Sequence, residues 1–174
     1  MTALTLTLIG PDRPGLVRTL SERIAAVGGN WLESRMARLA GQFAGILLVE
    51  IPAGEVDRFI ADLHALEDKG LRATVERGLR EEPSAQHRTL LLELVGQDRP
   101  GIVREIAQAL AGRGVNIEEL TTRVVSGSFS GESLFEAQAK LRVPPEVPAD
   151  DLQDLLEKLA NELMVDISLD QPAG

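Results

Sequence analysis

The stretch Gly10-Pro11-Asp12-Arg13-Pro14-Gly15-Leu16-Val17-Arg18 returns 86 residues later in the chain as Gly96-Gln97-Asp98-Arg99-Pro100-Gly101-Ile102-Val103-Arg104. Between 10 and 33, 11 of 24 positions are identical to their counterparts, and the match needs no gap. Other pairs at this offset are Leu4, Leu6 and Leu8 with Leu90, Leu92 and Leu94, Gly28 with Gly114, Asn30 with Asn116, Glu33 with Glu119, Phe43 with Phe129, and Gly45 with Gly131. The chain is therefore interpreted as a duplication.

Each copy is expected to contain four strands and two helices. Leucine alternates with threonine from Leu4 to Leu8, which is the period-two pattern of a strand with one buried face. Pro14 and Gly15 open a helix with apolar residues at helical spacing, namely Leu16, Leu20, Ile24 and Val27. Gly28-Gly29 ends that helix, and strands over 30–39 and 43–51 follow, joined at Gly41. The second helix carries Val56, Phe59, Ile60, Leu63 and Leu66, and the last strand carries Leu71, Ala73 and Val75.

The second copy repeats this order, with about six extra residues after Gly131, since Pro52 corresponds to Pro144. The order β-α-β-β-α-β is that of the ferredoxin-like unit. Right-handed crossovers place both helices on one face of a four-stranded antiparallel sheet. We expect Thr5, Thr7, Arg72 and Thr74 on the other face. The sequence thus predicts an α+β protein of two tandem ferredoxin-like βαββαβ domains, over 1–79 and 88–170, with a linker over 80–87.

The composition excludes several classes of protein. The 174 residues include 18 Lys and Arg against 27 Asp and Glu, a formal net charge of −9, which argues against direct binding to nucleic acid. Cysteine is absent, so disulfides, thiol nucleophiles and cysteine metal sites are excluded. No stretch approaches the ~18 apolar residues of a membrane span, and the start lacks the pattern of a signal peptide. We expect a cytoplasmic protein that does not contact membranes.

The excess of acidic residues lies in the second half of the chain. Residues 87–174 carry 8 basic and 15 acidic side chains, net −7, against 10 and 12, net −2, for residues 1–86. Acidic residues cluster on the second helix of this half, at Asp150, Asp151, Asp154 and Glu157. We interpret them as a solvated helix face, with attraction of a basic protein partner as the alternative.

The repeated Asp-Arg-Pro-Gly turn has two interpretations. In the structural one, Asp12 caps the helix by accepting a hydrogen bond from the Gly15 amide, and Pro14 suits the first turn. In the functional one, the amides at the helix start bind a carboxylate that glycine lets approach, and Asp12 receives an ammonium group. These two groups are the ones that a free amino acid carries.

A single copy is too long for Asp12 and Asn30 to reach the same small ligand. About fourteen helical residues separate them, or ~21 Å at 1.5 Å per residue. If two copies pair about a pseudo-twofold axis, Asp12 faces Asn116 and Asp98 faces Asn30. The pairing could form within one chain or between two chains of a homodimer.

The turn followed by Gly-Gly-Asn, on this frame, resembles the ACT domain, a module that binds amino acids and regulates enzymes or transcription. The tandem arrangement resembles the family of glycine cleavage system transcriptional repressors. The resemblance implies a non-enzymatic sensor of glycine or a similar amino acid, acting as a negative regulator of glycine cleavage genes through a transcription-factor partner. It implies no cofactor or metal. The ligand-binding residues that it implies are Asp12, Arg13, Pro14, Gly15, Leu16 and Asn30, with Asp98, Arg99, Pro100, Gly101, Ile102 and Asn116.

One departure from the family pattern affects specificity. Serine-binding members have Asn in the turn, preceded two positions earlier by His, whereas this chain has Asp12 after Gly10 and Asp98 after Gly96. Two alternatives to the sensor remain. One is a regulatory fragment or relative of formyltetrahydrofolate deformylase, whose amino-terminal region the motif also resembles. The other is a purely structural interaction module.

Other candidate residues have simpler structural interpretations. His64 is expected as a surface or partly buried residue, and His87 lies in the linker. Glu118 and Glu119 are a candidate carboxylate pair, but strand neighbours point to opposite faces, so solvated charge is favoured. Trp31 is expected to pack in a core or an interface, with the lining of a pocket as the alternative. Ser126 to Ser133 is an expanded hairpin loop, favoured as a tolerated surface insertion, with contact to a partner or cover over the site as the alternative.

Overall fold

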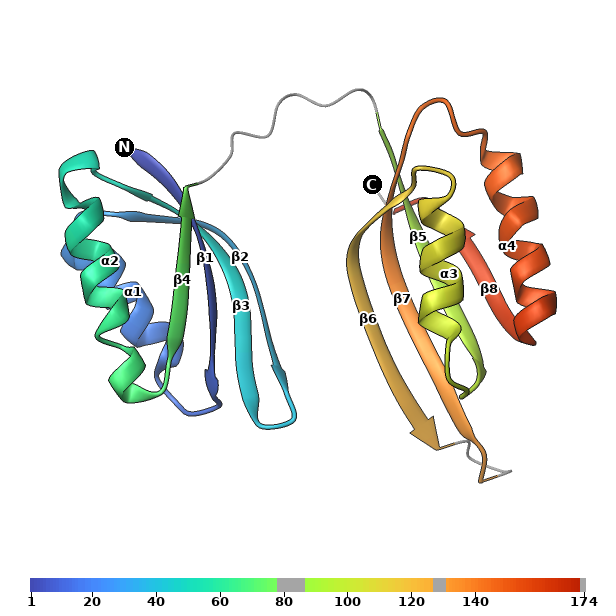
Figure 1. The fold of residues 1–174 in the computed structure, drawn as a ribbon, viewed down its shortest axis with the longest axis horizontal. Helices are drawn as coiled ribbons and strands as arrows, with labels where there is room; N and C mark the ends of the chain where they lie inside the picture. Colours follow the sequence, from blue (N-terminus) through green and yellow to red (C-terminus); the bar gives the residue numbers. More distant parts are fainter. Residues whose placement is uncertain (78–86, 127–130, 173–174) are drawn as a thin grey trace. The chain divides into compact units, whose positions relative to one another are not determined.

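The computed structural model describes residues 1–77, 87–126 and 131–172 (Figure 1). It divides into two compact units, Met1–Glu81 and Glu82–Gly174. The predicted linker, apart from His87, and the tip of the expanded hairpin loop lie outside the described residues.

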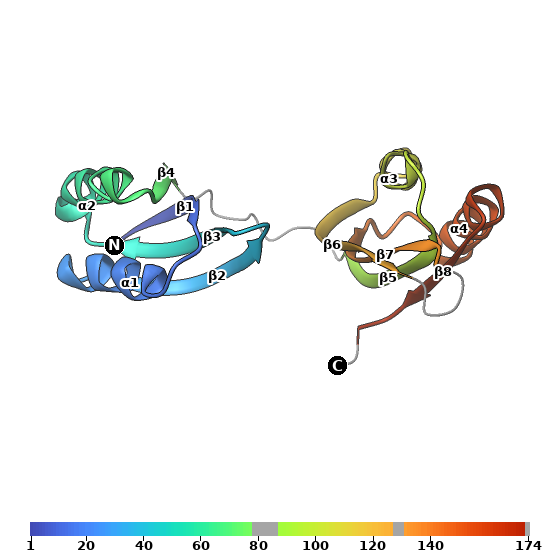
Figure 2. The same cartoon turned by 90° about the horizontal axis from the view of Figure 1, so that it is seen from below.

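The first unit follows the predicted order of elements. Its strands are β1 Thr2–Pro11, β2 Asn30–Leu39, β3 Gln42–Ile51 and β4 Arg72–Arg77, and its helices are α1 Leu16–Ala26 and α2 Val56–His64. Two short 3-10 helices, Ala53–Glu55 and Glu67–Lys69, flank α2. The antiparallel sheet has the order β2-β3-β1-β4, and both helices cover one face (Figures 1 and 2).

The second unit has the same architecture. Its strands are β5 Arg88–Gln97, β6 Asn116–Ser126, β7 Ser133–Val143 and β8 Val165–Asp170, and its helices are α3 Ile102–Ala111 and α4 Ala149–Leu163. The sheet order β6-β7-β5-β8 corresponds strand by strand to that of the first unit. The prediction of two ferredoxin-like βαββαβ units, each with its helices on one face, is confirmed.

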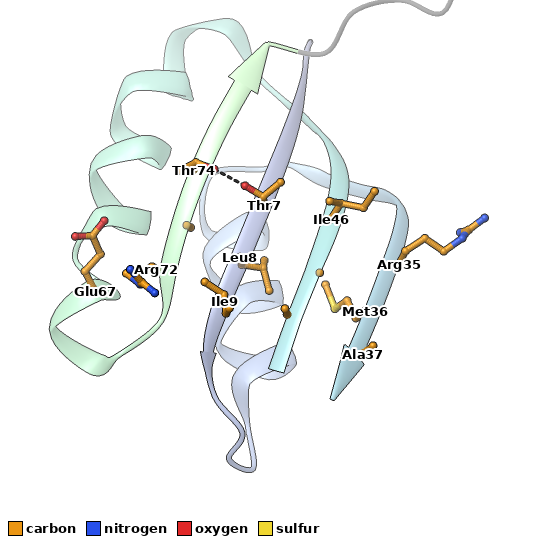
Figure 3. A pocket seen from close by; sticks show the side chains of 13 residues that line it. Thr7, Leu8, Ile9, Arg35, Met36, Ala37, Ile46, Glu67, Arg72 and Thr74 are labelled. Atoms are coloured by element: carbon orange, nitrogen blue, oxygen red, sulfur yellow. Dashed lines mark hydrogen bonds between the residues drawn. The ribbon is translucent and has the colours of Figure 1, made fainter. Parts of the chain in front are cut away.

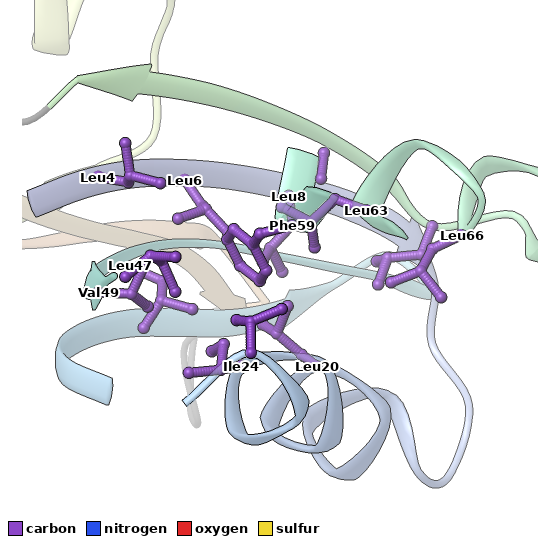
Figure 4. Packing of buried hydrophobic residues seen from close by; sticks show 14 of the residues in the cluster. Leu4, Leu6, Leu8, Leu20, Ile24, Leu47, Val49, Phe59, Leu63 and Leu66 are labelled. Atoms are coloured by element: carbon purple, nitrogen blue, oxygen red, sulfur yellow. The ribbon is translucent and has the colours of Figure 1, made fainter. Parts of the chain in front are cut away.

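Each unit buries its own core between the sheet and the two helices. In the first unit Phe59 of α2 is 0% exposed and lies among leucines of β1 and apolar residues of α1 (Figure 4). The predicted stripe of Leu16, Leu20, Ile24 and Val27 is buried there, and Trp31 packs against the cluster while partly buried. A separate cluster of second-unit residues fills the other core. The periodic apolar residues thus hold each helix against its sheet. This packing fixes the position of the turn that precedes the helix.

The opposite face of the first sheet is uncovered among the described residues. Thr7 and Thr74 are exposed there, and their hydroxyl groups form a hydrogen bond between β1 and β4. Arg72 lies on the same face, two residues before Thr74. This confirms the predicted orientation of Thr7, Thr74 and Arg72.

Strand register corrects one detail of the internal alignment. Gly10 pairs with Phe43 in the first unit, and Gly96 pairs with Phe135 in the second. The structural counterpart of Phe43 is therefore Phe135, and that of Gly45 is Ala137, so the predicted matches to Phe129 and Gly131 are wrong. The extra residues lie in the β6–β7 hairpin, before β7 begins at Ser133. Near an insertion, strand pairing therefore identifies equivalent positions better than identical residues at a fixed offset do.

Candidate ligand-binding site

The first Asp-Arg-Pro-Gly turn lies between the end of β1 and the start of α1. The Asp12 amide donates a hydrogen bond of 2.8 Å to the Gly41 carbonyl, at the β2–β3 hairpin. The Asp12 carboxylate lies 2.6 Å from Nε of Arg38 on β2. Among the described residues no side chain caps α1, so the structural interpretation of Asp12 as a helix cap is wrong. Arg38 attracts the carboxylate toward the hairpin instead.

Gly15 leaves the start of α1 open. It adopts φ +90° as the N-cap residue, a conformation that side chains of L-residues rarely take. A Cβ built on Gly15 meets no heavy atom of the described residues within 4 Å beyond its chain neighbours, and the first turn of α1 contains no acidic residue. The helix hydrogen bonds start with the Thr19 amide, which donates to the Gly15 carbonyl at 2.8 Å. The amides of Leu16, Val17 and Arg18 therefore have no acceptor within the helix. They form the positive end of the helix dipole, which favours an anion.

A hollow of about 260 Å³ borders this turn. Its walls combine the turn with the segment between α2 and β4, through Arg13, Pro14, Gly15, Leu16, Thr19, Leu66, Lys69 and Leu71. The Arg13 guanidinium donates a hydrogen bond to the Lys69 carbonyl, which ties the turn to that segment. Two cationic side chains in the wall favour an acidic group. The volume lies below the ~300–1,000 Å³ of pockets for drug-sized ligands, and it suits a small molecule.

Four of the six site residues predicted in the first copy meet at this hollow: Arg13, Pro14, Gly15 and Leu16. The Leu16 side chain is buried in the core, so chiefly its backbone amide is left to serve a ligand. Asp12 does not line the hollow. Asp12 is instead exposed beside it, within reach of Arg38.

Asn30 lies at the other end of the sheet. It pairs with Glu50 of β3, whereas Asp12 is hydrogen-bonded to Gly41, just before β3. Nine residues of extended chain separate Gly41 from Glu50, or about 30 Å. One unit therefore cannot present both Asp12 and Asn30 to a small amino acid, as the helix length predicted.

The second copy of the turn has the same backbone geometry as the first. The Asp98 amide donates to the Ser133 carbonyl at 2.9 Å, and Asn116 pairs with Arg142 at the far end of β7. Gly101 has φ +98°, and the Ile102 side chain behind it is buried. Pro100 is exposed between Arg99 and Gly101. The same turn is thus built twice, on equivalent strand ends.

The glycine two positions before each aspartate has a packing reason. A Cβ on Gly10 would lie 2.6 Å from the carbonyl oxygen of Gly70, which is backbone and cannot turn away. A Cβ on Gly96 would lie 2.7 Å from Cβ of Val165. Close approach of Gly70, just before β4, and of Val165 in β8 therefore leaves no room at these positions for the histidine that serine-binding family members carry.

A larger hollow, of about 800 Å³, lies on the uncovered face of the first sheet (Figure 3). Thr7, Arg72 and Thr74, which the sequence placed on this face, line it together with Ile9, Arg35 and Ile46. The predicted ligand-binding residues do not contribute to it. Its floor is a broad sheet surface, unlike the hollow at the turn, which has walls from separate segments.

The remaining sequence candidates lie on the surface. His64 is exposed at the end of α2, and Asp150, Asp151, Asp154 and Glu157 are exposed on α4, as a solvated helix face requires. In the described part of the chain no group of three or more His, Asp or Glu side chains could hold a metal. No helix within these same residues is long and apolar enough to span a bilayer.

Glu118 and Glu119 depart from the expectation that the strand keeps them apart. Nζ of Lys140 lies 3.6 Å from Oε2 of Glu118 and 3.7 Å from Oε1 of Glu119. The register of β6 against β7 shifts between Ile117 and Glu119, and such a bulge redirects neighbouring side chains. The two carboxylates therefore form ion pairs with one ammonium group, and Arg142 adds a second contact to Glu118 at 3.5 Å.

Sequence reasoning missed Thr19, Leu66, Lys69 and Leu71 in the wall of the hollow, and Glu105 at the second turn. The first wall forms because the chain after α2 returns beside the turn, which no local pattern reveals. Glu105 has a signal in the sequence, because Thr19 stands at the equivalent position of an otherwise similar segment.

Comparisons with known proteins agree with this architecture. Residues 2–76 and residues 90–140 each match the ACT domain. The glycine cleavage system transcriptional repressors of Escherichia coli (strain K12) and Shigella flexneri are each 23% identical to this chain over 164 residues, which is 92% of this chain and 85% of each relative.

Two solved structures share the fold over nearly the whole chain. A crystal structure of an unknown protein from Galdieria sulphuraria is 28% identical, covers 99% of both chains and gives a TM-score of 0.88. Another, of a protein provisionally named as a glycine cleavage system transcriptional repressor, is 22% identical over 97% of this chain and 96% of its own, with a TM-score of 0.71, and shows likeness of fold alone. Two ACT domains stand in tandem here, and the chain belongs to the ACT-domain family.

Proposed function

We propose that this protein is a regulatory sensor that binds glycine or a similarly small amino acid at its Asp-Arg-Pro-Gly turn. The observation that carries the proposal is the open N-terminus of α1 at Gly15, beside a hollow walled by Arg13 and Lys69. Amides without an acceptor in the helix, together with cationic side chains, suit the carboxylate of the ligand. The Asp12 carboxylate is the group that would receive its ammonium.

We propose that the asparagine of the site comes from a second ACT unit. Asn30 lies about 30 Å along the sheet from the turn of its own unit, so it cannot complete that site. We therefore keep the pairing of Asp12 with Asn116, and of Asp98 with Asn30, as part of the proposal. It applies equally to units of one chain and of two chains.

The test of binding is isothermal titration of the full chain against each of the twenty amino acids. We expect saturable binding of one or a few small amino acids, and loss of that binding in Asp12→Ala and in Asn116→Ala. Glu33→Ala, which removes an exposed carboxylate paired with Arg35 at 3.0 Å elsewhere on β2, is the matched control and should bind normally. If no amino acid binds at millimolar concentration, the sensor is excluded and a structural interaction module remains.

The output that we propose is negative regulation of glycine cleavage genes through a protein partner. It rests on the likeness to the transcriptional repressors, and on the net charge of −9, which opposes direct contact with DNA. Deleting the gene should raise expression of a glycine cleavage reporter, and purification under mild crosslinking should recover a DNA-binding protein. Binding of the purified chain alone to promoter DNA at physiological salt would contradict this output.

A further inference from the structure

The two copies of the turn differ in what occupies the space beside the N-cap glycine. Their backbones agree, since Gly15 has φ +90° and Gly101 has φ +98°, and neither helix has a capping side chain. We define the N-cap space as the position that a Cβ on this glycine would take. In the first copy no heavy atom of the described residues lies within 4 Å of it, apart from the glycine and its two chain neighbours.

In the second copy this space is bordered by a carboxylate of the chain itself. Oε1 of Glu105 lies 3.3 Å from the Cβ position on Gly101, and Nη2 of Arg104 lies 3.5 Å from it. The other oxygen of Glu105 is 3.4 Å from Nη2 of Arg99, an arginine of the turn. Oε1 is also 3.9 Å from Nη2 of Arg104. Glu105 is thus an acid in the first turn of α3, held between two guanidinium groups.

The equivalent groups of the first copy have other partners. Thr19 stands at the position of Glu105 and brings no charge. Arg13, the counterpart of Arg99, donates to the Lys69 carbonyl. Arg18, the counterpart of Arg104, donates to Oε1 of Glu22 at 2.8 Å, and this hydrogen bond together with the negative charge of Glu22 raises the pKa of the Arg18 guanidinium. Within the described residues neither arginine has an atom within 4 Å of the N-cap space, which Thr19 leaves open, while Arg13 still walls the hollow beside it.

We infer that Glu105 is an internal carboxylate that closes the second copy of the site, so that each chain binds one amino acid, at the first copy. This inference rests on the proposed function. In the second copy the Glu105 carboxylate lies beside the turn and pairs with Arg99, although it accepts no capping hydrogen bond from the α3 amides. A ligand carboxylate would have to displace Glu105 from both arginines and approach it as a like charge. An attached group also competes at high effective concentration, so a dilute ligand does not displace it.

The test compares the two helix starts in the same full-length protein by NMR. Acetate is the probe, because it carries the carboxylate alone, and sodium chloride at equal ionic strength is the control. In wild type, acetate should shift the backbone amides of Leu16 and Val17 and leave those of Ile102 and Val103 unchanged. Shifts at both helix starts, or at neither, would overturn the inference.

Reciprocal exchange of the two residues gives the variants. Glu105→Thr should open the second copy, so that acetate also shifts Ile102 and Val103. Thr19→Glu should close the first copy, so that the shifts of Leu16 and Val17 disappear. Both positions lie in the first turns of helices and are not fully buried, and glutamate is favourable at a helix start, so the variants should fold. Preserved spectra elsewhere in the chain confirm that they do.

Titration with the amino acid that binds wild type completes the test. We expect one site per chain in wild type, two in Glu105→Thr, and an affinity at least about tenfold lower in Thr19→Glu, equivalent to about 1.4 kcal/mol. Failure of Glu105→Thr to open its helix start to acetate would refute the role of Glu105. If acetate behaves as expected but no amino acid binds, the proposed function fails and the closure by Glu105 stands.

Discussion

The Asp12 carboxylate and the Arg38 guanidinium form an ion pair of 2.6 Å that joins the turn before α1 to the end of β2. The side chains are 35% and 68% exposed, so water screens the pair and its contribution to stability is small. The pair instead decides where the carboxylate points. Arg38 is therefore a competitor of any ammonium group that Asp12 receives.

Variants of this pair separate its structural role from its binding role. Asp12→Asn and Arg38→Gln should each change the free energy of unfolding by less than about 1 kcal/mol. Asp12→Asn should lower the affinity for the bound amino acid at least about tenfold, or about 1.4 kcal/mol, whereas Arg38→Gln should raise it, because the carboxylate loses its internal partner. Titration calorimetry and chemical denaturation measure the two effects. Equal affinity in Asp12→Asn and wild type would leave Asp12 with a structural role alone.

The part of this architecture that the sequence predicts is the part encoded by local periodicity. Leu16, Leu20 and Ile24 recur at helical spacing, so their burial against β1 follows from the pattern. The turn is equally visible, because proline fixes the backbone dihedral φ whereas glycine permits positive values of φ. Its repetition makes it the candidate site before the fold is known.

Contacts between distant segments were beyond the reach of that reasoning. Lys69 reaches the turn because the chain after α2 returns beside it, and its spacing from Arg13 carries no signal. The bulge at Ile117 likewise brings Glu118 toward the same lysine as Glu119, against the alternation of a regular strand. Arg38 reaches Asp12 only because the β2–β3 hairpin folds back on β1.

A side chain at Gly15 should strain the backbone without meeting a neighbouring atom. Gly15→Ala should lower the free energy of unfolding by about 1–2 kcal/mol, because φ +90° is unfavourable for alanine while its methyl group meets no neighbour within 4 Å. It should also weaken amino-acid binding, since the methyl group enters the N-cap space. Gly54→Ala is the matched control: its Cβ also meets no neighbour, its φ lies outside the strained region, and stability should change by less than about 0.5 kcal/mol. A loss of 4 kcal/mol in Gly15→Ala would mean that the space is not open.

Lys140 gives a prediction about charge in the second unit. Lys140→Met should lower stability by about 1 kcal/mol or less at physiological salt, because Glu118 and Glu119 lose the ammonium between them. The loss should shrink as salt is added, since screening weakens interactions of exposed charges. Denaturation at two salt concentrations measures this. Lys158→Met, which breaks an exposed helix pair with Glu162 at 3.9 Å, is the control and should show a smaller effect. A salt-independent loss would point to packing of the lysine stem.

The two separate cores predict that a cavity in one unit leaves the other intact. Phe59 and Leu156 are 0% and 2% exposed in different clusters, so Phe59→Ala should cost about 3–5 kcal/mol in the first unit and Leu156→Ala about 2–5 kcal/mol in the second. Trp31 is the one tryptophan of the chain and packs against the first core, so its fluorescence reports the first unit.

Phe59→Ala should shift the fluorescence transition to lower denaturant. Leu156→Ala should shift only part of the circular dichroism transition, because both units contribute to that signal. If Leu156→Ala moved the fluorescence midpoint as far as Phe59→Ala does, the units would unfold as one, and their cores would be energetically coupled.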